Sequence, residues 1–130
     1  MQVTGDHLNE LSSIILDSSI AVHKEMGPGL LEGVYQHCML LELRNRGLIV
    51  NQLVPVRLHY KGIPINKEYV IDILVEDEII LELKSLDGLL KVHEAQILSY
   101  LRLTNKRLGF LINFNVPLLK DGFRRFVNKL

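Results

Sequence analysis

The sequence predicts an α/β fold in which a mixed central β-sheet is flanked by helices. Three observations lead to this prediction. Two stretches with helical periodicity, divided by Gly27-Pro28-Gly29, lie within residues 6–46. Strand-like runs follow over residues 49–85. A further helical pattern at 89–104 then precedes an apolar strand-like run at 107–113. The element order is therefore α-α-β-β-β-α-β, and a length of 130 residues fits a single domain over residues 1–130.

The first predicted helix opens the chain. It begins at a cap residue, either Thr4 or Asp6, and ends near Met26, because Gly27-Pro28-Gly29 breaks the helical pattern. Its apolar stripe recurs at helical spacing through Leu8, Leu11, Ile15, Ser18 and Val22, with Ile14 beside it.

A second helix is predicted over residues 30–46, with Gly47 as its C-terminal cap. We expect its apolar side to carry Val34, Cys38, Leu40 and Leu41. Cys38 is the one cysteine of the sequence, which excludes an intrachain disulfide and a thiolate metal cluster within the chain. A helix-core position is its simplest role.

Three strands are predicted to follow the helical hairpin, over residues 49–60, 63–75 and 79–85. Pro55 and Pro64 favour edge positions or irregular starts for the first two, because proline cannot donate a ladder hydrogen bond. The closing stretch, residues 120–130, alternates apolar and basic residues and fits either a final edge strand or a short helix.

Composition narrows the possible functions. Apolar residues make up 48% of the sequence, which is high for so small a domain and favours a homodimer that covers some apolar surface. A formal net charge of zero gives no general argument for nucleic-acid binding. Local basic clusters at 102–107 and 120–129 could contact a phosphate backbone, or could be solvated surface charge. The sequence has no membrane-length apolar run and no signal-peptide pattern, so a cytoplasmic location is expected.

Asp72, Glu82 and Lys84 are ionisable residues set inside two otherwise apolar β-type runs. A carboxylate on the buried side of a strand costs several kcal/mol unless it is paired or binds a cation. Glu82 and Lys84 are two residues apart and so share one face of their strand. We therefore expect either a metal-assisted hydrolytic site or a buried ion pair between Lys84 and one of the acids.

The convergence of the two acids depends on the hairpin register. Asp72 lies directly across from Glu82 if Val75 pairs with Ile79, which leaves residues 76–78 as a three-residue loop. Without a glycine in this loop, Asp77 or Glu78 must adopt a left-handed backbone conformation. A two-residue turn would shift the register by one residue and place the acids on opposite faces.

The convergent arrangement implies metal chemistry. Two carboxylates and a backbone carbonyl, that of Leu83, suit a hard cation such as Mg²⁺ or Mn²⁺, which keeps other positions for water and a phosphate oxygen. Such a cation polarises a phosphoryl group and lowers the pKa of a bound water. Lys84 would steer that water or stabilise charge in the transition state.

An aspartate in a hairpin strand followed by Glu82-Leu83-Lys84 resembles the PD-(D/E)XK nuclease superfamily, whose core has the same order of helix, three strands, helix and strand. The chain is more closely similar to the GxxExxY family within it. Gly29, Glu32 and Tyr35 fill that family's motif in GLLEGVY. The similarity extends from about residue 8 to residue 125 and includes IDILVEDEIILELKS, HEAQILSYL and LGFLINFNVPLLK.

The resemblance implies a restriction-endonuclease-like fold and assigns Asp72, Glu82 and Lys84 to the metal-binding and catalytic core. Glu32 corresponds to an acid on the first core helix that faces the metal. Its place in the first helical turn also suits a simple favourable interaction with the helix dipole. Val70 departs from the pattern, because an arginine is expected two residues before the aspartate, and this weakens the expectation of phosphate binding.

Gln96 and Tyr100 match a QxxxY element that lies near the active site in exonuclease-like branches of the superfamily. With Tyr35 they are assigned to substrate binding. The residue spacing offers another interpretation, because Gln96 and Tyr100 share a helix face and could hydrogen-bond each other at the edge of the core.

The leading hypothesis is a Mg²⁺- or Mn²⁺-dependent nuclease that hydrolyses phosphodiester bonds in nucleic acid, with DNA as the expected substrate. The competing hypothesis is a catalytically inactive module with the same fold that binds nucleic acid or a protein partner. A purely structural role, with the acids held in ion pairs, is a third. Metal-dependent stabilisation and cleavage assays separate the three.

Overall fold

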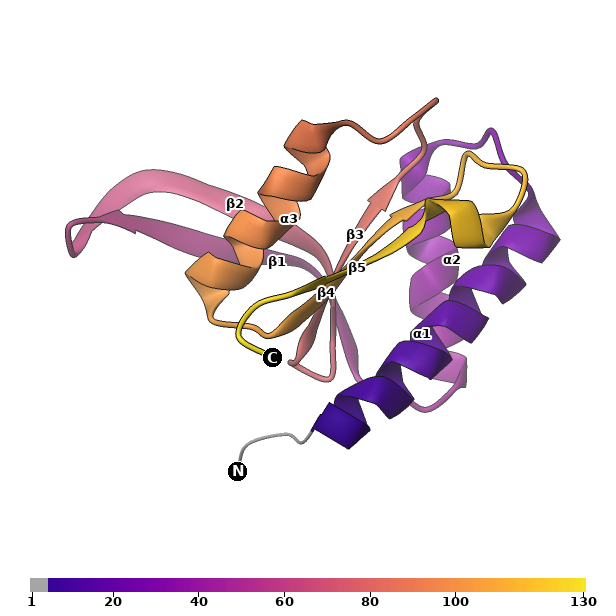
Figure 1. Ribbon diagram of the computed structural model, residues 1–130, viewed down its shortest axis with the longest axis horizontal. Coiled ribbons are helices and arrows are strands. Elements are labelled where there is room, and N and C mark those ends of the chain that lie inside the picture. Colours follow the sequence, from indigo (N-terminus) through magenta and orange to yellow (C-terminus); the bar gives the residue numbers. More distant parts are fainter. Residues whose placement is uncertain (1–4) are drawn as a thin grey trace.

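The computed structural model describes residues 5–130 (Figure 1). Its elements are α1 (Gly5–Met26), α2 (Glu32–Asn45), β1 (Val50–Tyr60), β2 (Ile63–Val75), β3 (Ile79–Lys84), α3 (Lys91–Thr104), β4 (Leu108–Asn113), the short 3₁₀ helix η1 (Leu119–Gly122) and β5 (Phe123–Val127). This order confirms the predicted one. The closing stretch, for which the sequence left a strand or a short helix open, begins in η1 and continues as the edge strand β5.

The five strands of the described chain form one mixed sheet in the order β1-β2-β3-β4-β5. Neighbouring strands are antiparallel except β3 and β4, which run parallel and are joined by the crossover helix α3. One apolar cluster joins α1 and α2 to one face of the sheet, and a smaller cluster joins α3 to the other (Figure 1). The predicted α/β fold is therefore confirmed, and β1, which contains Pro55, is an edge strand.

Helix α1 packs on the sheet through the predicted stripe. Leu8, Leu11, Ile15, Ser18 and Val22 are all buried, as is Ser19. The Ser18 and Ser19 hydroxyls donate to the carbonyls of Ile14 and Ile15, so neither buried hydroxyl lacks a partner. Asp6 lies in the first turn, and Thr4, the alternative cap, lies outside the described residues. No helix within residues 5–130 combines the length and apolar character needed to span a membrane.

The buried face of α2 differs from the predicted one. Tyr35, Met39, Leu40 and Leu43 are buried. Val34 and Leu41 are 36% and 51% exposed, and Cys38 is half-buried, so of the predicted face only Leu40 is in the core. Apolar residues lie on several sides of this helix, and its rotation is set by Tyr35. The Tyr35 hydroxyl donates to the Gly27 carbonyl (2.6 Å), and the ring stacks on Phe114 (4.5 Å between centroids).

The C-terminus of α2 is closed by the predicted glycine. Gly47 has a φ of 85°, a left-handed conformation that favours glycine. Its N–H donates to the Arg44 carbonyl (2.9 Å), and the N–H of Leu48 donates to the Leu43 carbonyl (3.2 Å). These two bonds form a Schellman motif, and Leu48 packs on the core beside it.

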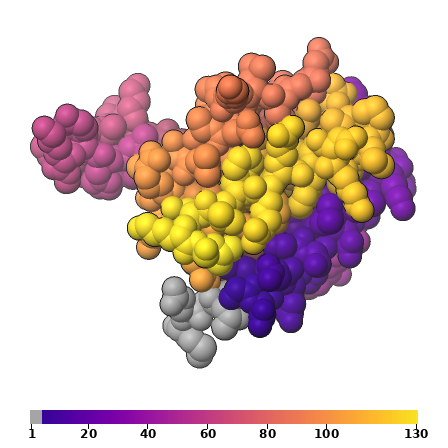
Figure 2. Space-filling model, viewed as in Figure 1, coloured from indigo at the N-terminus to yellow at the C-terminus, as the bar shows by residue number. Residues whose placement is uncertain are grey.

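Strands β1 and β2 continue beyond the sheet as a two-stranded ribbon, which we call the arm (residues 54–70). Figures 1 and 2 show it projecting from the rest of the molecule. At its base the β1–β2 pairing runs from Gln52–Ile73 to Val54–Ile71 without a partner pair between them. Leu53, in this gap, has a φ of 51°. The arm therefore begins at a break in the ladder beside Asp72.

Candidate active site

The hairpin of β2 and β3 has the register that the sequence predicts. Its pairs are Val75–Ile79, Leu74–Ile80 and Ile73–Leu81. One step further, the same register places Asp72 across from Glu82 on one face. The loop has positive φ angles at Glu76 (52°) and Asp77 (57°), so two residues take up the left-handed backbone, of which the sequence predicts only Asp77.

Asp72 lies where the regular β2–β3 ladder ends, and its side chain continues the pairing. Its Oδ2 accepts a hydrogen bond from the N–H of Leu83 (2.8 Å). Gln36 of α2 donates from Nε2 to the Asp72 carbonyl (3.4 Å). A strand residue directs its N–H and C=O to the same neighbouring strand. The Leu83 carbonyl therefore faces the side on which Asp72 lies.

Glu82 is the buried acid of the pair, with 7% of its surface exposed. Its Oε1 is buried and has no hydrogen-bond partner among residues 5–130. Burial, followed by the charge of Asp72, raises the pKa of Glu82 to about 8, and the charge of Lys84 opposes this rise. Because an unpartnered buried carboxyl oxygen costs stability, it indicates a site adapted to something other than folding.

The other two carboxyl groups are perturbed by the same neighbours. Burial raises the pKa of Asp72, against the opposing effects of the Leu83 N–H and the charge of Lys84. Burial also raises the pKa of Glu32, which the charge of Lys84 lowers and that of Asp72 raises. Glu32, from the first turn of α2, thus lies close enough to interact with the hairpin residues, as the resemblance implies.

Lys84 does not form the ion pair that a structural explanation of the acids would require. In the described part of the chain no acidic oxygen lies within 4.0 Å of its amine. Its side chain is half-buried at the end of β3, where it lowers the pKa values of all three neighbouring carboxyl groups. The structure therefore holds a lysine and three acids together without salt bridges between them.

Helix α3 brings one of its two predicted site residues to the acids. Tyr100 is half-buried, and burial together with the charges of Glu82 and Asp72 raises its pKa. Gln96 is exposed one turn away and makes no hydrogen bond with Tyr100 in the structure, so the alternative of a Gln96–Tyr100 pair is not found.

Tyr69 is a site residue that the sequence does not reveal. Its ring stacks on Tyr100 with 3.7 Å between centroids, and its hydroxyl donates to the Tyr100 carbonyl (3.1 Å). Burial, followed by the charge of Glu82, raises its pKa. Strand alternation places Tyr69 on the face opposite Asp72. The alternation of β2 is interrupted next to Asp72, because Tyr69, Ile71 and Leu74 all join the same apolar cluster.

Tyr35 is not a substrate contact in this structure. It has no exposed surface, and its hydroxyl is already used, since it donates to Gly27 and accepts from the N–H of Leu30 (3.1 Å). The assignment of Tyr35 to substrate binding is therefore corrected to a structural role. It fixes the loop that leads into Glu32.

Two further polar residues hold the ends of the site in place. The Ser85 hydroxyl donates to the Leu30 carbonyl (2.5 Å) and so joins the end of β3 to the loop before Glu32. Asn113 is buried, accepts from the N–H of Leu86 and donates to its carbonyl, both at 3.0 Å. The sequence signal for Asn113 is an amide that closes an otherwise apolar strand.

The donor set fits a hard divalent cation with few protein ligands. Within residues 5–130 no three histidine, cysteine or acidic side chains form a metal-binding group. Asp72 and Glu82, with the Leu83 carbonyl, supply oxygen donors that suit Mg²⁺ or Mn²⁺, ions that retain several waters. The unpartnered Oε1 of Glu82 is the atom that such a cation would satisfy.

Comparison with known proteins gives one match. The family model of the PD-(D/E)XK nuclease superfamily matches residues 9–126, a segment that includes every residue of the candidate active site. Neither the curated proteins nor the solved structures gave a match.

Proposed function

The chain belongs to the PD-(D/E)XK nuclease superfamily, and from this premise we propose that it is a metal-dependent phosphodiesterase that cleaves nucleic acid, with DNA as its substrate. One observation carries the proposal. The buried Oε1 of Glu82 has no partner although Asp72 and Lys84 are its neighbours. The Asp72 and Glu82 side chains hydrogen-bond each other, but a protein that used them only for stability would be expected to satisfy this buried oxygen as well.

The restriction-endonuclease-like core explains how the chain presents these groups, and we propose that it belongs to the GxxExxY branch. Gly29 has a φ of 91°, which allows the sharp path from α1 to α2. The Tyr35 hydroxyl fixes that path by its hydrogen bonds with the Gly27 carbonyl and the Leu30 N–H. Between them, Glu32 lies in the first turn of α2, where the charges of Lys84 and Asp72 act on its carboxyl group. In this proposal Gly29 and Tyr35 serve to position the carboxyl group of Glu32, the third residue of the motif.

In the proposed mechanism Asp72, Glu82 and the Leu83 carbonyl would hold a Mg²⁺ or Mn²⁺ ion, a class of cofactor that nucleases of this superfamily generally use. When bound, the cation supplies charge that polarises a phosphoryl oxygen and lowers the pKa of a water. Glu82 would have to lose its proton to serve as a ligand, and the positive charge of the cation would offset the repulsion by Asp72 that raises the pKa of Glu82.

The remaining residues act on the substrate and the water. The Lys84 amine orients the attacking water and stabilises negative charge on the phosphoryl oxygens. Glu32 would act from α2 on the waters that such a cation retains. Tyr100, held by its stack on Tyr69, and the exposed Gln96 position the substrate strand along α3. Val70 supplies no charge in place of the expected arginine, so Lys84 carries this role without that partner.

The proposal is tested by a cleavage assay. Linear, circular and single-stranded DNA and the corresponding RNA are incubated with Mg²⁺ or Mn²⁺, or with chelator. Glu82→Gln and Lys84→Ala are compared with two controls, Glu78→Gln in the hairpin loop and Lys91→Ala at the start of α3. We expect cleavage by the wild type and both controls, and its loss in chelator and in both site variants.

Two results would contradict the proposal. Cleavage that persists in Glu82→Gln would identify a contaminating nuclease. The absence of cleavage in every reaction, from protein shown to be folded by circular dichroism, would leave a nuclease fold that does not hydrolyse these substrates.

A further inference from the structure

The arm carries a local excess of positive charge. Between residues 54 and 70 lie Arg57, Lys61 and Lys67 against a single acid, Glu68, which gives the arm a formal charge of +2. Because the whole chain is neutral, the remainder has a formal charge of −2. The predicted basic clusters elsewhere are partly neutralised, since Lys106 pairs with Asp77 and Arg124 with Glu94; these two pairs lie in the described part of the chain.

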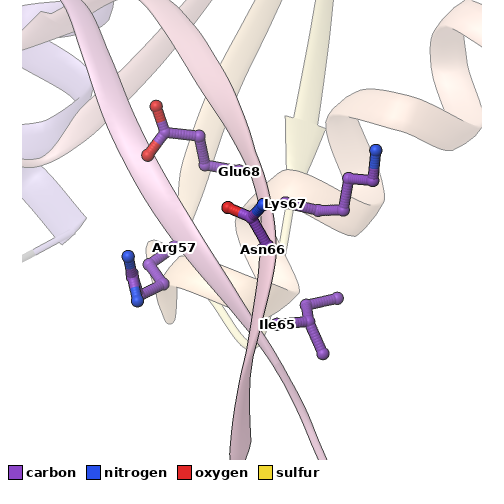
Figure 3. Close-up of a pocket in the computed structure, with 5 residues that line it drawn as sticks. All are labelled: Arg57, Ile65, Asn66, Lys67 and Glu68. Carbon is purple, nitrogen blue, oxygen red and sulfur yellow. The ribbon is translucent and has the colours of Figure 1, made fainter.

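The basic side chains of the arm are not used to hold the arm together. Within residues 5–130 the side chains of Arg57 and Lys67 form neither hydrogen bonds nor ion pairs, and the Lys61 amine lies 5.4 Å from the centre of the Tyr60 ring. Figure 3 shows the Arg57 and Lys67 side chains extending to opposite sides of the ribbon. The arm therefore presents cations on both of its sides.

A β-bulge produces this arrangement. Arg57 pairs with Glu68 and His59 with Pro64, so that Leu58 alone faces residues 65–67 of β2. Such extra residues increase local twist and redirect side chains. Beside the bulge is an open hollow of about 260 Å³, lined by Arg57, Ile65, Asn66, Lys67 and Glu68 (Figure 3).

The length of the arm matches a repeat of double-stranded nucleic acid. At about 3.3 Å per strand residue, Lys67 lies roughly 16 Å from Asp72 along β2 and Lys61 roughly 36 Å. One turn of a DNA duplex is about 34–36 Å long. A two-stranded ribbon also fits the major groove of a duplex. Single-strand binding, in contrast, relies on several aromatic stacking surfaces, and Tyr60 is the one exposed aromatic side chain on the arm.

We propose that the arm binds the sugar–phosphate backbone of a double-stranded nucleic acid, up to about one helical turn from the bond held at Asp72 and Glu82. This inference rests on the proposed function, because it extends the footprint of the same site and makes a duplex the substrate. Arg57 and Lys67 contact phosphates near the base of the arm, and Lys61 does so at its tip.

The test measures binding without cleavage. Fluorescence anisotropy in chelator gives dissociation constants for DNA and RNA duplexes of about 10 and about 25 base pairs and for a single strand, over a range of salt concentrations. The arm variant is Arg57→Gln/Lys61→Gln/Lys67→Gln. The matched control removes the same charge from the body through Arg46→Gln/Lys120→Gln/Lys129→Gln.

We expect the arm variant to bind the long duplex on the order of a hundredfold more weakly near 0.1 M salt, with the slope of log K against log salt reduced by about three. The control variant keeps most of the affinity and slope. The effect is smaller on the short duplex, because a duplex of about 10 base pairs centred on the site extends only about 17 Å to either side and so does not reach Lys61. A DNA duplex and an RNA duplex that respond differently to the arm variant identify which double helix the arm fits.

Three results would overturn the inference: equal losses in the arm and control variants, an unchanged affinity in the arm variant, or conversion of a wild-type dimer to a monomer by the arm substitutions. The last would show that the exposed Tyr60 and Ile63 at the tip contact a second copy of the chain. Cleavage assays on the same duplexes separate this inference from the proposed function. If the arm variant cleaves and binds like the wild type, the inference about the arm is refuted and the proposed nuclease activity stands. If the wild type binds through the arm but does not cleave, the proposed nuclease activity is refuted and the inference about the arm stands.

Discussion

At the scale of single residues, the protonation of Glu82 links the site to folding stability. Its pKa is about 8 in the folded protein against an ordinary value of 4.5, so between these values the folded state holds a proton that the unfolded chain has lost. Stability from this group is complete below about pH 4.5 and decreases as the pH rises to about 8. The raised pKa of Asp72 acts in the same direction.

We therefore expect the melting temperature in chelator to fall between about pH 5 and pH 8.5, and Glu82→Gln to reduce that fall and to be more stable than the wild type at the alkaline end. Differential scanning calorimetry across this range measures the effect. Glu78→Gln, in the loop of the same hairpin, serves as control and should keep the wild-type slope. Parallel curves for the wild type and Glu82→Gln would contradict this interpretation.

Asp72 gives a second prediction at this scale, because a cation held by it and Glu82 stabilises the folded state by mass action. At a Mn²⁺ concentration about a hundredfold above its dissociation constant, the gain is about 2.7 kcal/mol, or several degrees in melting temperature. Asp72→Asn should abolish this gain while Glu78→Gln preserves it. Thermal denaturation with and without Mn²⁺ measures both, and an unchanged melting temperature in millimolar Mn²⁺ would argue against a metal site.

The sequence identifies the central residues of the site because their chemistry conflicts with their surroundings. Asp72, Glu82 and Lys84 interrupt apolar strands, and the hairpin register follows from simple geometry. Tyr35 and Tyr69 could not be assigned in the same way. The hydroxyl of Tyr35 finds its hydrogen-bond partners inside the protein, and Tyr69 lies beside the site only because the alternation of β2 is interrupted next to Asp72.

At the scale of secondary structure elements, α1 and α2 differ in how much their sequences determine. The apolar stripe of α1 is narrow and strictly spaced, so its buried face is predictable. In α2 apolar residues lie on several sides, and the rotation is decided by the tertiary contacts of Tyr35 with Gly27 and Phe114. No local pattern contains that information.

The two glycines of the α2 region give a matched pair of predictions. Gly47→Ala should destabilise the protein by about 1 kcal/mol, because its left-handed φ of 85° disfavours a side chain. Gly33→Ala, inside α2 where an added Cβ meets no atom within 4 Å, should stabilise it by up to about 1 kcal/mol. Urea denaturation measures both changes. Shifts of the same sign would show that α2 ends or packs differently.

At the scale of the whole molecule, the sequence predicts the order of elements and the mixed sheet, but not the separation of the arm from the sheet. Strand-like patterning continues without interruption through residues 50–60. Leucine is a poor residue for a left-handed backbone, so nothing local indicates the break at Leu53. The position of the arm became evident only in three dimensions.

The homodimer that the apolar composition favours remains a proposal, and α2 suggests where it would form. Val34 and Leu41, expected in the core, are exposed on the outer side of this helix. We predict that the wild type is a dimer and that Leu41→Gln shifts it toward monomer, as measured by light scattering after size-exclusion chromatography. Lys91→Gln, on α3, is the control and should leave the mass unchanged. A wild-type protein that is only monomeric at high concentration would contradict the predicted dimer.

The break at Leu53 has a consequence for how related chains can diverge. Because the ladder is interrupted there, residues added to or removed from the arm need not disturb the β2–β3 register that brings Asp72 close to Glu82. Each two residues inserted in both strands would lengthen the arm by about 7 Å and keep every side chain on its original face. Changes in the length of the arm could therefore set the minimum length of duplex that the protein requires for cleavage.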